Sequence, residues 1–492
     1  MRKHPWLTAA AVLAVLGGLL YFYVEWHAEK RWQRYATEAR VRGVKLYYAD
    51  FNRPEIPEAQ NFAELPMLKK ALAGEKDAMP FKLPKRPRST QSDGGKKSSF
   101  YDDGSPPFGD SKPETKIDWK EWQKYFLAVG FLTETSDDPV RDTLRGIEHY
   151  EPQFREWSEW RTTRPQFWLP ISPTNGQRLP VTTLTQASML FHLRMAAHLA
   201  AGDSTAAYAD FQDSWQAPRV MQADPGLVNG ILRAGTLQYL LEAWGKGARD
   251  HAWADAELQK IDHDLASLQL WDDYCECLAG GRCEINREIE KVMNLPLRER
   301  AQFQNDAGNL FSSRTAILAQ VTPRSLFRDN QWRMNRYLDE LTVPGGATGQ
   351  TFNPDRHTPS SPQNIVSSYD KDYYFLCVMA GDAYEVLERT YMRLQILLDE
   401  ARLACALERF YLARKAYPET LAELVPEFIP AVPTDIYAGA PYHYQRMGEA
   451  SYRLYGVGEN RKDDGGKVGP GLPKGQQPDA VWSYAPAEAK GK

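Results

Sequence analysis

The first long run of hydrophobic positions lies at the N-terminal end of the chain. Residues 6–24 contain no charged side chain, and a helix of this length, at 1.5 Å per residue, roughly matches a hydrocarbon core of about 30 Å. Arg2 and Lys3 precede the run, and aromatic residues within 21–26 follow it, as at a membrane interface. The pattern predicts a transmembrane anchor over residues 1–28. A cleaved signal peptide is the alternative, but residues 21–26 are bulky, whereas a cleavage site requires small side chains.

After the anchor, the pattern is first helical and then loses its periodicity. Residues 29–79 predict a helical neck that continues the membrane helix. Residues 80–116 are poor in branched apolar side chains and rich in Pro, Gly, Ser and charge, so that ordering them would cost more entropy than burial returns. We therefore expect a disordered linker over 80–116.

Apolar residues recur at helical spacing through residues 117–352, which predicts an all-α domain. Its strongest amphipathic segments, 182–201 and 205–217, are separated by a Gly-Asp-Ser turn and predict a helical hairpin. The spacing of Ala207, Phe211 and Ser214 is weakly similar to the second helix of a tetratricopeptide repeat, although the first-helix positions of that repeat are absent.

The pattern changes again towards the C-terminal end. Residues 353–380 predict a linker and the start of a helix, and 381–492 predict a long helix followed by a small α+β unit. Alternating residues at 442–446, 451–457 and 481–484 predict a three-stranded antiparallel sheet. The expected fold class is therefore mainly α.

This last region resembles the head domain of the major pseudopilin of type II secretion over about residues 398–492. Six segments occur in the order found in that family: ALERFYLARKAYP, ETLAELV, PAVPTD, GAPYHY, YRLYGVG and DDGG. The N-terminal Gly-Phe processing junction of the family is absent, and about 350 residues separate the anchor from the head, so prepilin processing and filament assembly are not expected. The whole arrangement looks more like single-span bacterial membrane proteins that carry such a head after a helical domain.

The charges around the anchor and the resemblance disagree on orientation. Six basic residues between Lys30 and Lys45 follow the hydrophobic run, whereas Arg2 and Lys3 precede it, which favours a cytoplasmic body. The resemblance implies the opposite, because pseudopilin heads lie outside the inner membrane. We expect a single-pass inner-membrane protein with a periplasmic body.

The resemblance also implies a calcium loop in the head. Asn460, Asp463, Asp464 and Asp479 are the candidate ligands, since calcium prefers oxygen donors. Asn460 stands where the family has Asp, and Arg461 with the following Lys adds positive charge, so a solvated turn is the alternative. No other cofactor is predicted.

The five cysteines give a second set of alternatives. Cys275, Cys277 and Cys283 are disulfide candidates if the body is exported, with Cys283 paired to one of the other two. Free thiols and a zinc site completed by a fourth ligand are the other possibilities. Cys377 and Cys405 lie in apolar helical context and are expected in the core.

Composition and motifs argue against several functions. Lys plus Arg (60) nearly balance Asp plus Glu (64), which argues against a nucleic-acid partner. The chain lacks a Gly-x-Ser-x-Gly motif, a phosphate loop and a His-Glu-x-x-His motif, so no catalytic residue is predicted.

We therefore expect a non-enzymatic, membrane-anchored envelope protein that serves as a scaffold for protein partners, with a link to type II secretion or pseudopilus-like assembly. The alternative is a cell-envelope hydrolase in which paired carboxylates of the helical domain, such as Asp137–Asp138 or Asp272–Asp273, converge near the aromatic residues at 154–168.

Overall fold

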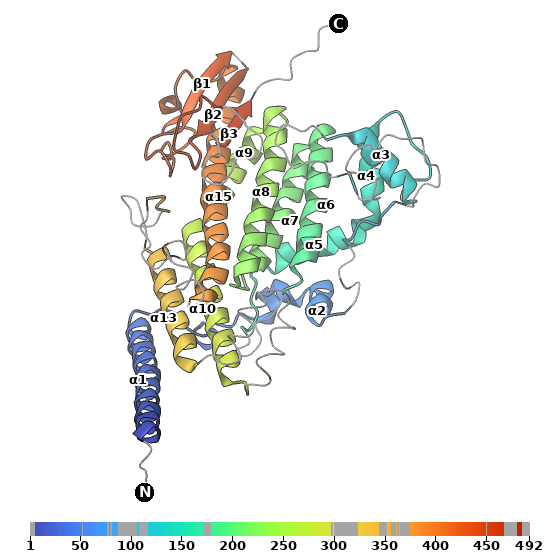
Figure 1. Ribbon diagram of the computed structural model, residues 1–492. Helices are drawn as coiled ribbons and strands as arrows, with labels where there is room; N and C mark the ends of the chain where they lie inside the picture. The colour runs from blue at the N-terminus through green and yellow to red at the C-terminus, as the bar shows by residue number, and fades with distance from the viewer. Residues whose placement is uncertain are drawn as a thin grey trace, which may run out of the picture.

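A computed structural model shows a mainly α-helical protein with a small antiparallel sheet near its C-terminal end (Figure 1). The structure describes residues 5–51, 53–75, 78, 81–86, 106–107, 117–171, 179–296, 299, 323–343, 352–355, 361, 364, 374–448, 450–466 and 480–484.

The described elements follow the order expected from the hydrophobic pattern. The helices are α1 (Pro5–Val41), α2 (Pro66–Leu72), α3 (Trp119–Ala128), α4 (Pro139–Ile147), α5 (Glu151–Thr163), α6 (Val181–Ala200), α7 (Ser204–Met221), α8 (Leu227–Arg249), α9 (Asp255–Ala266), α10 (Leu270–Asn294), α13 (Arg324–Leu341) and α15 (Phe375–Arg414). The strands are β1 (His443–Gly448), β2 (Ser451–Gly456) and β3 (Ala480–Tyr484).

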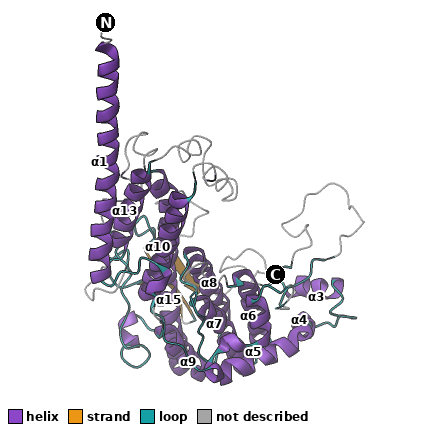
Figure 2. Ribbon diagram, turned by 90° about the horizontal axis from the view of Figure 1, so that it is seen from below, coloured by secondary structure: helices purple, strands orange, loops and turns teal. Residues whose placement is uncertain are grey.

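Helix α1 has two halves with different surroundings. Its N-terminal half is long and apolar enough to cross a membrane, and no part of its most apolar stretch is buried in the body. Figure 2 shows this half projecting away from the other helices, whereas the C-terminal half lies beside α13. There Trp32, Tyr35 and Ala39 are buried, because their spacing places them on one helix face. The first part of the predicted neck, residues 29–41, therefore continues the apolar helix without a break, and the helix ends at Val41.

The predicted hairpin is formed by α6 and α7, and its turn follows from local chemistry. Gly202 takes a positive φ of 82° that ends α6, and the side chain of Asp203 accepts a hydrogen bond from the Ala206 amide at the start of α7. Helix α7 runs past the predicted end and contains Pro218. Together with α8, these helices form the middle of the body (Figure 1).

Part of the expected disordered linker is ordered, which corrects that prediction for residues 81–86. Phe81 is fully buried against Phe154 and Trp157, and the Tyr150 hydroxyl donates to the Lys82 carbonyl at 2.9 Å. Burial of the aromatic side chain and hydrogen bonds to the backbone stabilise the segment by more than the entropy that ordering it costs. Most of 87–116 lies outside the described residues.

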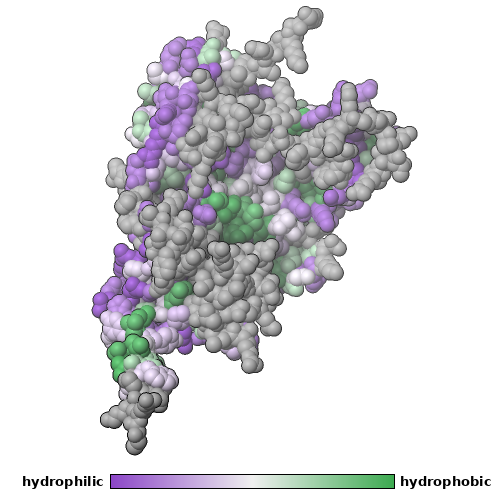
Figure 3. Space-filling view, viewed as in Figure 1, coloured by the Kyte–Doolittle hydropathy of each residue, from purple (hydrophilic) through white to green (hydrophobic). Residues whose placement is uncertain are grey.

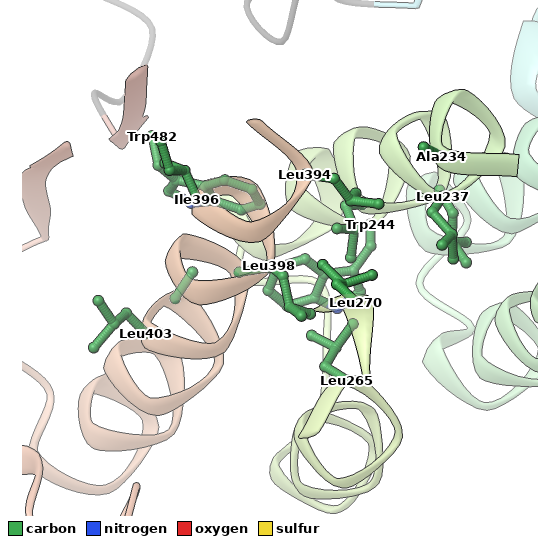
Figure 4. Close-up of a cluster of buried hydrophobic side chains, with 14 of the residues drawn as sticks. Ala234, Leu237, Trp244, Leu265, Leu270, Leu394, Ile396, Leu398, Leu403 and Trp482 are labelled. Atoms are coloured by element: carbon green, nitrogen blue, oxygen red, sulfur yellow. The ribbon is translucent and has the colours of Figure 1, made fainter. Parts of the chain in front are cut away.

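The small sheet packs on the helical body rather than standing apart from it. Its order is β1-β2-β3, all antiparallel, and Leu454 at its centre pairs with Tyr444 and Trp482. Trp482 contacts Trp244 of α8 with ring centroids 5.7 Å apart. Figure 4 shows residues of α8, α15 and β3 in one cluster, and this hydrophobic cluster joins part of the body to the C-terminal unit.

Candidate functional site

A cleft of about 580 Å³ opens between α7, α8 and α10. Its rim includes Arg53 from the segment after α1 and Phe167 from the segment after α5. The volume lies within the range of small-molecule sites, roughly 300–1,000 Å³. Two neighbouring cavities, one of them also lined by Arg233 and Asp273, are much smaller, at about 10 Å³ each.

A buried ion pair lies in this cleft. Arg233 of α8 and Asp273 of α10 are 5% and 4% exposed, and the Arg233 guanidinium donates to the Asp273 carboxylate. Gln222 of α7 donates its amide to the second oxygen of Asp273. The Nε–H of Arg233 has no hydrogen-bond partner among the described residues. A buried donor without a partner costs about 1–3 kcal/mol, and this atom is closed off from the cleft as well.

A second charged cluster connects the rim to the neck. Glu276 accepts hydrogen bonds from Lys45 and Arg53, each at 2.8 Å. Burial by itself raises the pKa of Glu276, but these two bonds and charges outweigh it and hold the pKa below its ordinary value. Arg53 also donates to the Ala223 carbonyl at 2.6 Å. One wall of the cleft is thereby fixed to the chain that leaves α1.

Close packing holds α10 against the start of α8, beside the cleft. A Cβ atom at Gly280 of α10 would lie 2.1 Å from the carbonyl oxygen of Pro225, which precedes α8. A Cβ atom at Gly230 of α8 would lie 2.5 Å from the Cys277 sulfur. Glycine is required at these two positions because any side chain would push α10 away from α8.

The paired carboxylates named in the sequence do not form a facing pair. Asp272 and Asp273 both line the cleft, but neighbours on a helix point about 100° apart, and Asp273 is neutralised by Arg233. Asp138 caps α4 by accepting from the Val140 and Arg141 amides, and Asp137 is exposed. Asp138 thus stabilises the start of α4, and Asp273 joins α10 to α8.

The aromatic residues at 154–168 belong mainly to the core. Phe154 and Trp157 are buried, and Trp160 stacks beneath the Arg164 guanidinium at 3.9 Å. Phe167 is the member of this group that reaches the cleft.

Sequence reasoning missed two buried acids beside these aromatics. Asp210 of α7 accepts from Arg194, and burial raises its pKa to about 7. Asp213 accepts from Arg161 and from Ser158. A signal was present, because residue 210 shares a helix face with the apolar position 207. Both acids are held in ion pairs between α5, α6 and α7.

The candidate calcium ligands make hydrogen bonds to one another and to their own loop. Asn460 turns its amide nitrogen towards Asp464 at 2.8 Å, while its oxygen accepts from the Lys462 amide. Asp463 accepts from Tyr455 and from the Gly465 amide. The described residues contain no group of three His, Cys, Asp or Glu side chains fit to hold a metal ion. Asp479 lies outside them.

The expected disulfide is not formed, and all five cysteines are in the thiol state. Cys275, Cys277 and Cys283 lie on the same helix, so Cys283 is about 9–12 Å along the axis from the other two, beyond the reach of a disulfide. Burial raises the pKa of Cys277 to about 11 and that of Cys283 to about 12, which keeps both thiols protonated. Cys377 and Cys405 are buried in the core, as predicted.

Comparisons with known proteins identify no relative of this chain. No family model, no curated protein and no solved structure matches the chain. The resemblance to the pseudopilin head therefore stays a prediction.

Proposed function

We propose that the protein is a single-span, membrane-anchored scaffold of the cell envelope, without catalysis of its own, that presents a rigid helical body to protein partners. The observation that carries the proposal is α1: one continuous helix has a free apolar half and a second half built into the body. A body joined in this way keeps a fixed orientation to the membrane, which a flexible tether would not provide.

The joint between α1 and the body is held by buried polar contacts. Asp339 of α13 accepts from Arg42 and Tyr35 of α1 and from Arg282 of α10, at 2.7, 3.1 and 2.7 Å. About three helical turns before Asp339 on α13, Arg328 donates to Glu29 at 2.7 Å. Three helices thus share one network, and no pair can separate without exposing an unpaired charge.

A face of α8 is suited to a partner helix. Val228, Leu232 and Tyr239 follow each other at helical spacing and are 65%, 40% and 41% exposed, and Gly235 between them has open space around its Cα. Figure 3 shows an apolar patch near the middle of this face of the molecule, where α8 runs in Figure 1. An amphipathic helix of another protein, with apolar residues at positions i, i+4 and i+7, would cover it.

The pseudopilin-like head supports a link to secretion or pseudopilus-like assembly. A long helix leads into a three-stranded antiparallel sheet, which is the order that the resemblance implies. In this proposal the body and head lie in the periplasm, with α1 in the inner membrane.

Reporter fusions test the anchor and its orientation. Alkaline phosphatase fused after Lys492 should be active in cells, and a fluorescent reporter restricted to the cytoplasm should be dark. The opposite result would place the body in the cytoplasm and refute the envelope role. Recovery of the full chain in the soluble fraction would refute the anchor.

Photo-crosslinking tests the partner face. A crosslinking amino acid at Leu232 should yield a defined adduct in intact cells, and V228E should abolish it. The same amino acid at the exposed Asp250, at the end of the same helix, serves as the control. Equal adducts at both positions, or an adduct that V228E leaves intact, would contradict a specific face.

A further inference from the structure

The cleft between α7, α8 and α10 is electrically balanced. Its lining holds three cations (Arg53, Arg219 and Arg233) and three acids (Asp272, Asp273 and Glu276). Two of the cations are already paired with acids of the cleft. A ligand with a net charge would therefore bring a charge that the lining does not compensate, which disfavours it in a partly desolvated site.

The cleft is also too polar for an apolar ligand. Polar side chains of the lining, among them Arg219 and Gln222, would lose water to an apolar ligand without gaining a hydrogen bond. Gln269 and Asp272 stand exposed on the rim with further donors and acceptors. The lining therefore favours an uncharged ligand that carries several hydrogen-bond acceptors and donors.

Two aromatic side chains contribute apolar surface beside these polar groups. Phe167 is half-buried at the rim, and Trp215 of α7 lies on the inner side. Pro218, one turn along α7, extends the same surface. A fitting ligand thus has apolar C–H surface as well as a polar edge.

From this combination we propose that the cleft binds an uncharged saccharide of about two sugar units. Pyranose rings present C–H faces that pack on aromatic rings, and their hydroxyl groups donate and accept at once, so they can bond to guanidinium, amide and carboxylate groups without a charge. Asp272 would accept from one hydroxyl group at the rim, and the Gln269 amide would donate to a second one. The volume of the cleft suits a ligand of this size.

Binding is measured on the full chain, purified in a detergent without a sugar headgroup, because glycosidic detergents would compete. Maltose, cellobiose and N,N′-diacetylchitobiose are titrated by calorimetry, with glucose 6-phosphate as the charged comparison. At least one disaccharide should bind saturably with a Kd between about 10 μM and 5 mM, and the sugar phosphate should bind at least tenfold more weakly.

Variants at the exposed rim locate the site without disturbing the core. D272A and Q269A should each weaken binding at least fivefold, whereas D250A, an exposed acid at the end of α8, should leave it unchanged.

Three results would overturn the proposal. They are the absence of saturable binding for all three disaccharides, tighter binding of the sugar phosphate, and binding that D272A and Q269A leave unchanged. The assay is independent of membrane topology, so its outcome is separate from that of the scaffold proposal.

Discussion

Gln216 of α7 is a buried polar side chain without a hydrogen-bond partner among the described residues. Both its amide oxygen and its amide nitrogen are unpaired, and the residue is 1% exposed. Burial of such groups costs about 1–3 kcal/mol. Q216M, which keeps the shape and removes both polar atoms, should therefore raise the free energy of unfolding by about 1 kcal/mol or more in urea denaturation.

Gln212 on the same helix provides the matched control. Its amide donates to the Tyr208 hydroxyl at 2.9 Å, so Q212M removes a satisfied bond and should not stabilise the protein. Equal effects of the two substitutions would show that the unpaired state of Gln216 is not the cause.

Asp399 of α15 makes the folding stability of the protein depend on pH. Burial raises its pKa to about 7, although Tyr442 and Gln395 both donate to it. The folded carboxyl keeps its proton where the unfolded one, with a pKa of about 3.9, has lost it. Its contribution to stability is therefore complete below about pH 4 and is lost as the pH rises towards 7.

D399N removes this titration. We expect a flatter dependence of the thermal midpoint on pH between about 4 and 8, with the variant more stable than the parent protein at the upper end. D463N, at an exposed carboxylate whose pKa is lowered by the Gly465 amide, should not change the dependence in this range. A parent protein whose midpoint does not fall over this range would contradict the assignment.

At the scale of elements, the joint between α1, α10 and α13 depends on Asp339. D339N leaves the buried Arg282 without a counter-ion, and breaking a buried pair in this way costs about 3–5 kcal/mol. Hydrogen exchange at the amides of residues 32–41 should become faster, because α1 separates from α13 more often. The free energy of opening derived from the exchange rates should fall by the same amount.

The control for this joint is an exposed pair of the same kind. Asp255 of α9 pairs with Arg409 of α15, and its side chain is 56% exposed. D255N should cost less than about 1 kcal/mol and leave exchange in α1 unchanged. If D339N behaves like D255N, the network does not hold the joint.

For the whole molecule, the contact between β3 and α8 decides whether body and sheet act as one unit. A Cβ atom at Gly245 would lie 2.6 Å from the Trp482 ring. G245A should therefore displace this ring, lower the thermal midpoint and speed hydrogen exchange in β3.

Gly235 on the same helix isolates the packing effect. Nothing lies within 4 Å of a Cβ atom there, so G235A should be neutral or stabilise the helix by up to about 1 kcal/mol. A G245A protein with the stability of G235A and unchanged exchange in β3 would show that the sheet is not fixed to α8.

The sequence predicted the elements of this molecule much better than its site. The Gly-Asp-Ser turn predicted between two helices is formed, and Asp203 caps α7 through the Ala206 amide, because a cap depends on residues three positions apart. The cleft was not expected, since Arg53, Trp215, Arg233 and Asp273 come from four separate segments. Asp272 and Asp273 were noted as a pair, but the ion pair between Asp273 and Arg233 is a long-range contact.

The sequence by itself determined the apolar first half of α1, the α6–α7 hairpin and the three strands, because each follows from the periodicity of a short window. Only the tertiary structure decided the burial of Phe81, the free state of Cys283, the network around Asp339 and the core shared through Trp482. These features depend on residues far apart in the chain, whose approach is fixed by the total burial of apolar surface and the pairing of buried charges rather than by local pattern.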